Sequence, residues 1–429
     1  MNFHVLVIGG GIAGMEAAIT LGDMGYKVLL VEKEPSIGGK MILLSKVFPT
    51  LDCASCICTP KMAATAHHPN ITLMTYTEVK EVEKKPDGSF SVRLLKKPRY
   101  VNESACTGCQ QCEKACPVMV PDEYNYGLTV RKAAYIPYPT ALPKVAVIDL
   151  DNCILCGACE RVCPAECIDF TQTAQEIEYT VGSVIISTGF KLFPAELKFH
   201  YGYGRFKNVI TAMQMDRLLS PTRPFNTILR PSDGKIPDNI AYILCTGSRD
   251  HTLDNILCSR VCCMYSIKQA QLLMGALPLA DITIYYIDIR AFSKGYEEFY
   301  EQAKAMGVYF VKGKVAKIEE KENGNLVLHY EDIENGGKTM QAEHDLVVLA
   351  VGLLPTPEIA GIFKDGLEID DYQYIKEVDE DLYPGKTSID GVFVAGAASA
   401  AMDIPDAILH SDASASLAAA HVEKLRRRK

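Results

Sequence analysis

A run of four cysteines followed by proline occurs twice in this chain and restricts what the chain can fold into. Both copies have the spacing C-x₂-C-x₂-C-x₃-C-P. In this pattern three closely spaced thiolates bind one 4Fe–4S cubane, and the fourth thiolate binds the neighbouring cubane. The repeat therefore predicts two clusters. The predicted ligands are Cys106, Cys109, Cys112 and Cys163 for the first cluster, and Cys153, Cys156, Cys159 and Cys116 for the second.

Zinc knuckles are the alternative interpretation of the repeat, because C-x-x-C is also a zinc spacing. Four cysteines in each copy, with a proline after the last one, favour iron–sulfur clusters over zinc. Cys167 lies outside both motifs, and we interpret it as a small buried residue.

The composition is that of a globular protein from a reducing compartment. The chain has 429 residues, 16 cysteines and a net charge of −9 at pH 7. We therefore expect metal or redox chemistry rather than disulfide staples, and no nucleic-acid partner. No apolar run approaches the length of a membrane-spanning helix, and the N-terminus lacks the positive region of a signal peptide. These features predict a cytoplasmic protein without membrane insertion.

The N-terminal residues have a dinucleotide-binding pattern. An apolar strand is predicted over residues 3–8, a helix over 15–21 and a second strand over 27–31. Glycines at the first turn let backbone N–H groups approach a pyrophosphate at the positive end of the helix, and an acidic residue after the second strand accepts hydrogen bonds from a ribose diol. The residues that occupy these positions are Gly9, Gly11, Gly14 and Glu32.

Three later segments favour FAD over NAD. A glycine pair and a lysine soon follow Glu32, as in flavoproteins with two dinucleotide-binding domains, and residues 184–189 and 390–396 are similar to the remaining FAD-contacting segments of that superfamily. The predicted FAD-binding residues in these segments are Gly38, Gly39, Lys40, Thr188, Gly189 and Gly396. The acidic residue that usually follows the last glycine and binds the ribitol is replaced by Ala397.

The cysteine repeat interrupts the FAD-binding domain. A strand is predicted before it, over residues 89–95, and another after it, over 176–181, so we expect an inserted domain of about seventy residues. The predicted domains are 1–97, 173–237 and 346–429 for the three parts of the FAD-binding domain, 98–172 for the ferredoxin domain, and 238–345 for a second dinucleotide-binding-like domain.

The second dinucleotide-binding-like domain lacks a nicotinamide fingerprint. A strand is predicted over 240–244, but no complete Gly-x-Gly-x-x-Gly pattern follows it. Four cysteines gather there instead, and they are Cys245, Cys258, Cys262 and Cys263. The spacing alone leaves two interpretations open, a four-thiolate metal site or buried structural cysteines.

These motifs together resemble the flavoprotein, or A-type, subunit of heterodisulfide reductase and its bacterial relatives. The similar segments include residues 7–14, 48–53, 96–101, both cysteine motifs, 247–250, 258–265 and 403–406. The resemblance implies an α/β fold with a thioredoxin-reductase-like pair of dinucleotide-binding domains and an inserted two-cluster ferredoxin domain of α+β type. It also implies a third, atypical 4Fe–4S cluster on Cys245, Cys258, Cys262 and Cys263. The chain is interpreted as a short form without the extra N- and C-terminal iron–sulfur domains.

The resemblance also suggests roles for single residues. Lys268 matches a position close to the flavin N5, where a cation stabilises electron density on the ring, and the alternative is a solvated helix lysine. A flavin-facing loop that opens the last helix matches Asp403, Ile404 and Pro405. Three further cysteines leave three possibilities open: cluster ligands shared with a partner, a thiol relay, or buried inert residues. They are Cys53, Cys56 and Cys58.

Three hypotheses of function follow. The first is an enzyme subunit that relays or bifurcates electrons within a heterodisulfide-reductase-like complex. Its partners are subunits of the B and C type, a donor subunit linked to a hydrogenase or dehydrogenase, ferredoxin, an acceptor subunit of the disulfide or quinone type, and a second copy of this chain. The second is a self-contained NAD(P)H:acceptor reductase similar to glutamate-synthase small subunits. The third is a non-catalytic electron-wire subunit.

Overall fold

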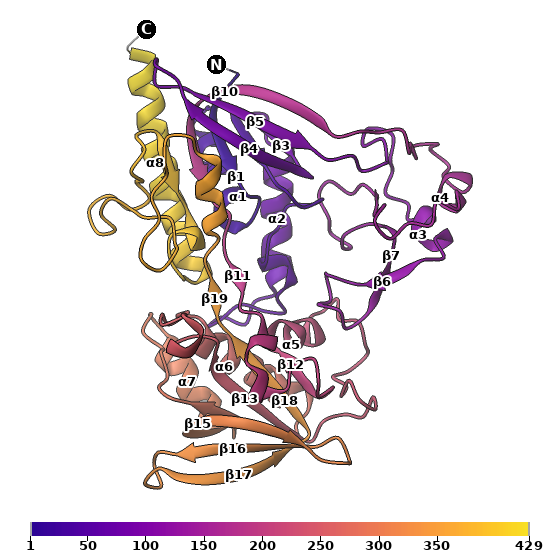
Figure 1. The fold of residues 1–429 in the computed structure, drawn as a ribbon, viewed down its shortest axis with the longest axis vertical. Helices are drawn as coiled ribbons and strands as arrows, with labels where there is room; N and C mark the ends of the chain where they lie inside the picture. The colour runs from indigo at the N-terminus through magenta and orange to yellow at the C-terminus, as the bar shows by residue number, and fades with distance from the viewer. Residues whose placement is uncertain (1, 428–429) are drawn as a thin grey trace. The chain divides into compact units, whose positions relative to one another are not determined.

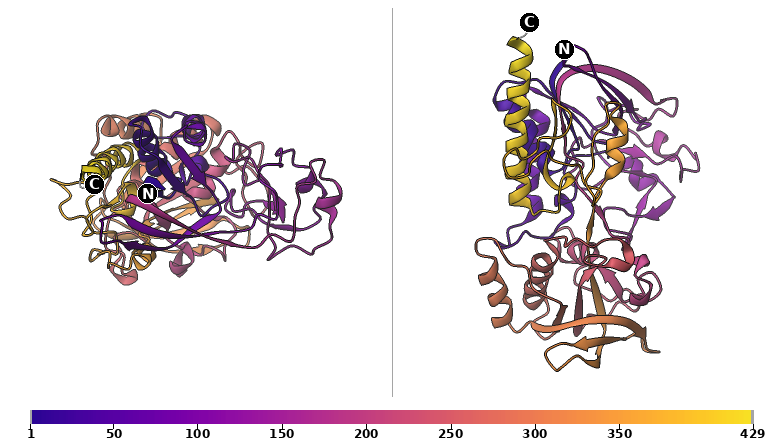
Figure 2. Two further views of the ribbon diagram at one scale, coloured as in Figure 1. Left: turned by 90° about the horizontal axis from the view of Figure 1, so that it is seen from above. Right: turned by 60° about the vertical axis from the view of Figure 1, so that its left-hand side comes forward.

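The computed structural model describes residues 2–427, which form two compact units. The first unit contains residues 2–42, 56–190 and 355–427, and the second contains 43–55 and 191–354. Figures 1 and 2 show the course of the chain, with the ferredoxin insertion in purple and the C-terminal helix in yellow.

The first unit is built around a mainly parallel sheet in the order β3-β2-β1-β10-β5-β4, and β20 pairs with β10. The strands are β1 (Phe3–Ile8), β2 (Val28–Val31), β3 (Ile71–Met74), β4 (Thr77–Lys84), β5 (Phe90–Lys96), β10 (Gln175–Ile186) and β20 (Val392–Val394). The helices are α1 (Ile12–Asp23), α2 (Ala54–His67) and α8 (Ile404–Arg427). The first two residues of α2 are assigned to the second unit. The apolar run of β1 is buried on both faces of the sheet, as expected for a central parallel strand.

The helices α1 and α8 pack against each other in this unit, and α8 also contacts β10 and β20. Figure 2 shows α8 running beside the strands of the first sheet. Because β1, α1 and β2 form a βαβ unit, the turn between β1 and α1 lies at the carboxyl edge of the sheet, where nucleotides bind in such folds.

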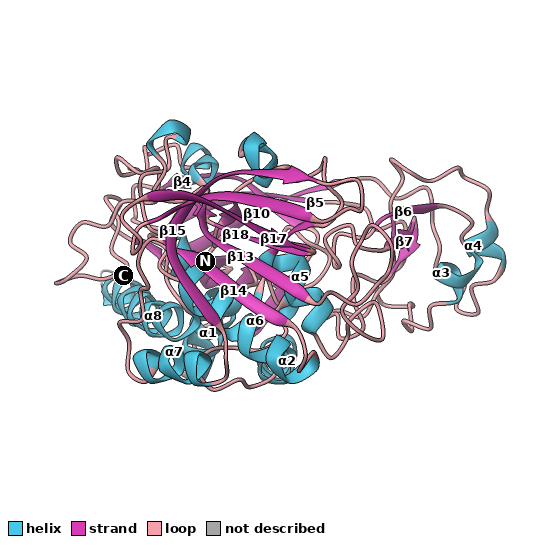
Figure 3. Cartoon of the chain, turned by 90° about the horizontal axis from the view of Figure 1, so that it is seen from below, coloured by secondary structure: helices cyan, strands magenta, loops and turns pink. Residues whose placement is uncertain are grey.

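The ferredoxin insertion connects two antiparallel neighbours of this sheet. β5 pairs with the first half of β10, from Gln175 opposite Lys96 to Val181 opposite Phe90, and residues 97–174 join the two strands. The insertion contains α3 (Gln111–Ala115), α4 (Ala158–Arg161), β6 (Met119–Pro121), β7 (Val130–Lys132), β8 (Ala134–Tyr135) and β9 (Val147–Ile148). Figure 3 shows its two short helices beside the hairpin β6–β7. Its small apolar core includes the buried cysteines Cys112, Cys116, Cys159 and Cys167.

The second unit has its own sheet in the order β12-β18-β13-β14-β15-β16-β17. Its strands are β12 (Val209–Thr211), β13 (Asn239–Thr246), β14 (Asp281–Tyr286), β15 (Tyr309–Glu320), β16 (Leu326–Asp332), β17 (Lys338–His344) and β18 (Leu346–Val351), and β11 (Lys191–Leu192) pairs separately with β19 (Leu353–Leu354). Its helices are α5 (Ala212–Leu219), α6 (Cys262–Ala276) and α7 (Tyr296–Ala305).

The unit boundaries differ from the domain boundaries predicted from the sequence. Residues 191–237 belong to the second unit rather than to the FAD-binding part, because β12 pairs in parallel with β18, with Ile210 opposite Val348. Residues 346–354 contain β18 and therefore also lie in the second unit. The short segment 43–55 belongs to this unit as well. In residues 2–427 no helix combines the length and apolarity that crossing a membrane requires.

Candidate functional site

The turn between β1 and α1 is closed tightly around two glycines. Gly9 has a φ of +110°, and a Cβ there would overlap the Ser187 carbonyl group. A Cβ on Gly14 would overlap the Gly9 carbonyl oxygen and lie 2.6 Å from Ser187 Oγ. The Ser187 hydroxyl donates to the carbonyl oxygens of Ile8 at 2.9 Å and Gly9 at 3.0 Å. The start of α1 is therefore held against β10 with backbone groups at the turn, as a pyrophosphate site requires.

Glu32 lies at the end of β2 with its carboxylate beside this turn. Its two oxygens accept the backbone N–H groups of Gly10 at 2.6 Å and Glu34 at 2.9 Å. Burial raises the pKa of Glu32, and the two backbone hydrogen bonds oppose that rise. The carboxyl group is fixed next to the glycine turn, where its remaining lone pairs suit a ribose diol.

The other predicted FAD segments of the first unit lie around the same turn. Gly38 N–H donates to Gly10 O at 2.8 Å, and a Cβ on Gly39 would lie 2.8 Å from Gly11 Cα. The ammonium of Lys40 lies 5.2 Å from the centroid of the Phe190 ring, and burial lowers the pKa of Lys40.

The strand ends on the other side of the turn complete this group. Thr188 Oγ1 lies 3.1 Å from Thr356 Oγ1, whose hydroxyl also donates to Gly189 O at 3.4 Å. A Cβ on Gly396 would lie 2.7 Å from the Cβ of Ala13 in α1. Gly396 therefore packs closely against the first turn of α1 at Ala13, and close glycine packing of this kind fits a dinucleotide site.

The first residues of α8 have a structural role in addition to the one that the resemblance implies. Asp403 precedes the helix, and its carboxylate accepts the N–H of Asp406 at 3.0 Å. Asp403 is therefore the N-cap of α8, with Ile404 and Pro405 in the first turn. The cap orients the positive end of the helix dipole at this loop.

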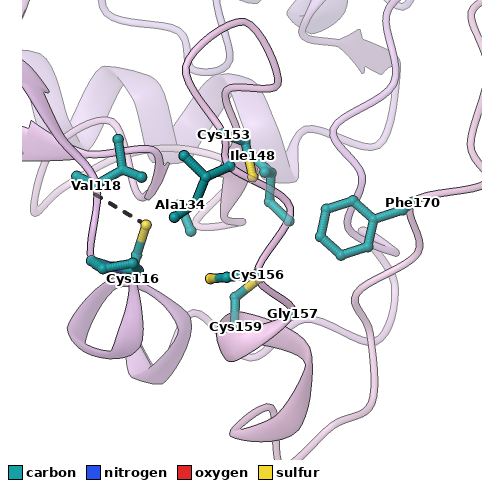
Figure 4. Close-up of a pocket in the computed structure, with 11 residues that line it drawn as sticks. Cys116, Val118, Ala134, Ile148, Cys153, Cys156, Gly157, Cys159 and Phe170 are labelled. Atoms are coloured by element: carbon teal, nitrogen blue, oxygen red, sulfur yellow. Dashed lines mark hydrogen bonds between the residues drawn. The ribbon is translucent and has the colours of Figure 1, made fainter.

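The two cysteine motifs fold into two matching loops. Gln110 and Gly157, at equivalent places in the two motifs, both have left-handed backbone, with φ of 64° and 67°, and each precedes a short helix. One cavity is lined by Cys106, Cys109, Cys112 and Cys163, together with Cys167. The other cavity is lined by Cys116, Cys153, Cys156 and Cys159, whose sulfur atoms point toward one another in Figure 4.

The structure thus brings together the same two sets of four cysteines that the spacing predicts. Within residues 2–427, no three His, Cys, Asp or Glu side chains are close enough to share one metal ion. A cubane offers a separate iron atom to each ligand, so its ligands stand further apart than those of a single ion. Burial raises the pKa of Cys112 to about 11, so cluster binding must displace a proton from that thiol.

The four cysteines of the second unit also lie near one another, on the segment that runs from the end of β13 to the start of α6. Cys245 has left-handed backbone with a φ of 56°, and Cys262 and Cys263 open α6. Burial, with the neighbouring thiols as a further cause, raises the pKa of Cys263 to about 12. The thiol of Cys263 donates to Asp288 O at 3.7 Å, and the N–H of Arg260 donates to Cys258 Sγ at 3.3 Å. This cluster of thiols occupies the position after β13 where a nicotinamide fingerprint would stand.

Lys268 of α6 is a buried ion-pair residue, so the interpretation as a solvated helix lysine is wrong. Its side chain and that of Asp216 in α5 are 1% and 2% exposed, and the ammonium donates to Asp216 Oδ1 at 2.6 Å. The carboxylate also accepts hydrogen bonds from Ser45 and from Gln269 Nε2, the latter at 2.7 Å. Its position next to a flavin stays a prediction.

Removing one member of this pair should destabilise the protein strongly, because the other charge is left buried without compensation. We expect Asp216→Ala to lower the free energy of unfolding by about 3–5 kcal/mol in urea denaturation. The matched control is Glu301→Ala, which breaks the exposed Lys304–Glu301 pair and should cost about 1 kcal/mol or less. Equal losses for the two variants would contradict the account of the buried pair.

The three cysteines at the start of α2 differ from one another. Cys53 and Cys56 are disulfide-bonded, whereas Cys58 is a free and buried thiol. Cys58 donates to Gly38 O at 3.8 Å, and burial raises its pKa to about 12. The sequence left open cluster ligands shared with a partner, a thiol relay, or buried inert residues, and it did not predict this disulfide.

Comparisons with known proteins agree with this architecture. Family models match residues 4–49 (FAD dependent oxidoreductase), 105–168 (4Fe-4S dicluster domain) and 283–415 (pyridine nucleotide-disulphide oxidoreductase). Thioredoxin reductase of T. acidophilum superposes with a TM-score of 0.55 at 16% identity and covers 97% of this chain and 98% of its own. Thioredoxin reductase of Lactococcus lactis superposes with a TM-score of 0.56 at 14% identity and covers 98% of this chain and 99% of its own.

The fold and sites define a flavin- and iron–sulfur-binding oxidoreductase. It has the thioredoxin reductase fold and an inserted dicluster ferredoxin domain, which confirms the predicted fold class.

Sequence relatives narrow this class. The A-type iron–sulfur subunit of the CoB–CoM heterodisulfide reductase of Methanocaldococcus jannaschii is 47% identical over 415 residues, which are 96% of this chain and 63% of that protein. The A-type subunit of the H₂:CoB-CoM heterodisulfide,ferredoxin reductase of Methanothermobacter marburgensis is 44% identical over 418 residues, with the same two coverages. Over 96% of its length the chain is therefore similar to A-type heterodisulfide reductase subunits, as the sequence motifs predict, and it spans about 63% of the length of these relatives.

Proposed function

We propose that this chain is the electron-distributing flavoprotein subunit of a heterodisulfide-reductase-like complex. It would take electrons from a partner donor subunit, and would pass them to ferredoxin and to an acceptor subunit of the disulfide or quinone type. A bound flavin exchanges electrons in pairs or singly, whereas a 4Fe–4S cluster exchanges them one at a time. Bifurcation needs this combination, because one electron must leave toward a strongly reducing acceptor and the other toward a weakly reducing one.

The observation that carries the proposal is the packing of the ferredoxin insertion, within the first unit, onto the segment that leads into Gly38 and Gly39. Ser36, two residues before Gly38, lies with its hydroxyl 2.6 Å from the Tyr138 hydroxyl of the insertion and accepts the N–H of Leu142 at 2.8 Å. The N–H of Ile37 donates to Leu142 O at 3.1 Å. These contacts fix the cluster-bearing insertion against the loop that leads into the FAD segments.

A buried arginine strengthens the same contact. Arg99 is 1% exposed, and its guanidinium donates at 2.6 Å both to Pro35 O and to Thr75 Oγ1. Its own carbonyl accepts the N–H of Ile148 in the insertion at 3.1 Å. The insertion is therefore held by buried hydrogen bonds as well as by its two peptide connections to β5 and β10. Such anchoring would keep the clusters at a fixed distance from the flavin, as electron transfer requires.

Each proposed cofactor has its own set of residues in this chain. FAD would be held by the glycine turn, Glu32 and the segments ending at Gly39, Gly189 and Gly396. The ferredoxin cysteines would hold two 4Fe–4S clusters. A third would be held by Cys245, Cys258, Cys262 and Cys263. Because these cysteines stand where a nicotinamide fingerprint is missing, we propose that electrons arrive from a partner subunit rather than directly from NAD(P)H.

Anaerobic mixing with nicotinamide nucleotides tests the partner-fed proposal. The purified chain is mixed with NADH and, separately, with NADPH, and flavin absorbance is followed in a stopped-flow instrument. We expect no rapid bleaching with either nucleotide, but full bleaching with dithionite, which serves as the control for a reducible flavin. Rapid bleaching by NADH or NADPH would contradict the proposal and indicate a self-contained NAD(P)H reductase. A flavin that stays oxidised in dithionite would indicate a subunit that only conducts electrons through its clusters.

A further inference from the structure

Cys167 lies inside the first cluster cavity, although it belongs to neither cysteine motif. Its Sγ is 3.4 Å from Cys163 Sγ, and its backbone N–H donates to the same sulfur atom at 3.5 Å. Cys167 is 5% exposed and lines the cavity together with the four predicted ligands. The first cavity is thus lined by five sulfur atoms.

The backbone holds Cys167 in this position. Glu166 has left-handed backbone with a φ of 48°, and its N–H donates to Cys163 O at 3.2 Å. This turn brings the side chain four residues after Cys163 back beside it. The carbonyl of Cys167 accepts the N–H of Asn102 at 2.7 Å, so the residue is tied to the start of the insertion.

The second cavity offers an internal comparison. The residue four places after Cys116 is Val120, in the hairpin strand β6, where it pairs with Arg131 of β7. The lining of the second cavity includes four cysteines, and the thiol of Cys116 meets only the Val118 carbonyl, at 4.0 Å. The two cluster sites therefore differ by one sulfur atom.

We infer that Cys167 is an alternative ligand of the first cluster and replaces Cys163 when that thiolate is lost. This inference rests on the proposed assignment of a 4Fe–4S cluster to the cavity. In the exchange, the Fe–S bond to Cys163 breaks and one to Cys167 forms, while the proton of the Cys167 thiol passes to the Cys163 sulfur. Where residue 163 is alanine, the vacant iron binds Cys167 and the proton passes to water, so in neither case are electrons gained or lost. Cys163 is partly exposed and Cys167 is buried, so the reserve ligand is the one better protected from oxidation.

Matched alanine variants of the full chain, purified without oxygen, test the inference. Iron and acid-labile sulfide per chain are measured together with the EPR spectrum of the reduced protein. We expect Cys163→Ala to keep the iron content of the wild type, a ratio of about 1, because Cys167 takes the vacant position. Cys116→Ala, whose site has no fifth sulfur, should lose at least one iron atom. The double variant Cys163→Ala/Cys167→Ala should lose iron as well.

Two results would overturn the inference. One is a loss of iron from Cys163→Ala as large as that from Cys116→Ala, with Cys163→Ser behaving in the same way. The other is a loss of iron from Cys167→Ala alone, which would make Cys167 an ordinary ligand. FAD content, measured on each sample, confirms that the variants are folded. If the wild type itself contains no iron in the ferredoxin sites, the proposed function fails, and this outcome is distinct from a failure of Cys167.

Discussion

Replacing Gly14 with valine is expected to abolish FAD binding and to yield a colourless protein. The first atom of any side chain there would overlap the Gly9 carbonyl oxygen and press on Ser187 Oγ, 2.6 Å away. The neighbours are backbone and a hydroxyl that is already hydrogen-bonded to Ile8 O and Gly9 O, so they cannot move aside without opening the turn. Overpacking of this kind costs about 1–3 kcal/mol and more where backbone must shift, and the pyrophosphate position is lost with the turn.

The measurements are the flavin absorbance of the purified variant and its free energy of unfolding in urea. The matched control is Gly275→Ala in α6, where a Cβ would have no heavy atom within 4 Å and the backbone is helical. That variant should keep its flavin and gain about 0.5–1 kcal/mol of stability, because alanine loses less backbone entropy than glycine in a helix. Full FAD occupancy in Gly14→Val would contradict the placement of the dinucleotide at this turn.

Replacing Cys262 with alanine is expected to remove the third cluster and leave the other cofactors in place. Cys262 is buried at the start of α6, and its burial together with three neighbouring thiols raises its pKa far above the usual range. Deprotonating buried, crowded thiols costs free energy unless a metal binds the thiolates. The loss of one ligand removes much of the free energy of metal binding. Iron per chain should fall by about four atoms, the content of one cubane.

The readouts are iron content, flavin absorbance and the EPR signals of the ferredoxin clusters. Cys58→Ala is the matched control, because Cys58 is likewise a free, buried cysteine of high pKa but donates only to the Gly38 carbonyl. It should retain all of the iron. An unchanged iron content in Cys262→Ala would show that the four cysteines of the second unit are structural.

The features that sequence reasoning found were those in which the chemistry fixes the spacing of nearby residues. The two cysteine motifs and the turn from Gly9 to Gly14 are local, because a cubane or a pyrophosphate demands a certain loop whatever the rest of the chain does. The apolar runs that form β1 and β13 also predicted strands correctly, since buried parallel strands are continuously apolar.

The features that were missed depend on contacts between distant residues. Nothing near Val209 shows that β12 would pair with β18, which moved residues 191–237 into the second unit. The partner of Lys268 lies in another helix, 52 positions away, so its burial was not visible from α6 alone. Cys167 is the exception, because its spacing of four residues from Cys163, with a proline between them, was visible in the sequence. The left-handed backbone at Glu166, which places Cys167 beside Cys163, was not.

The cofactor content of the anaerobically purified chain shows most directly whether one flavin and three cubanes share this chain. FAD, iron, zinc and acid-labile sulfide are measured on one sample, and the reduced protein is examined by EPR. We expect one FAD and about twelve iron atoms per chain, four for each of three cubanes, with sulfide equal to iron and no stoichiometric zinc. A chain that holds zinc at the ferredoxin cysteines, or that binds iron–sulfur clusters without flavin, would contradict the account.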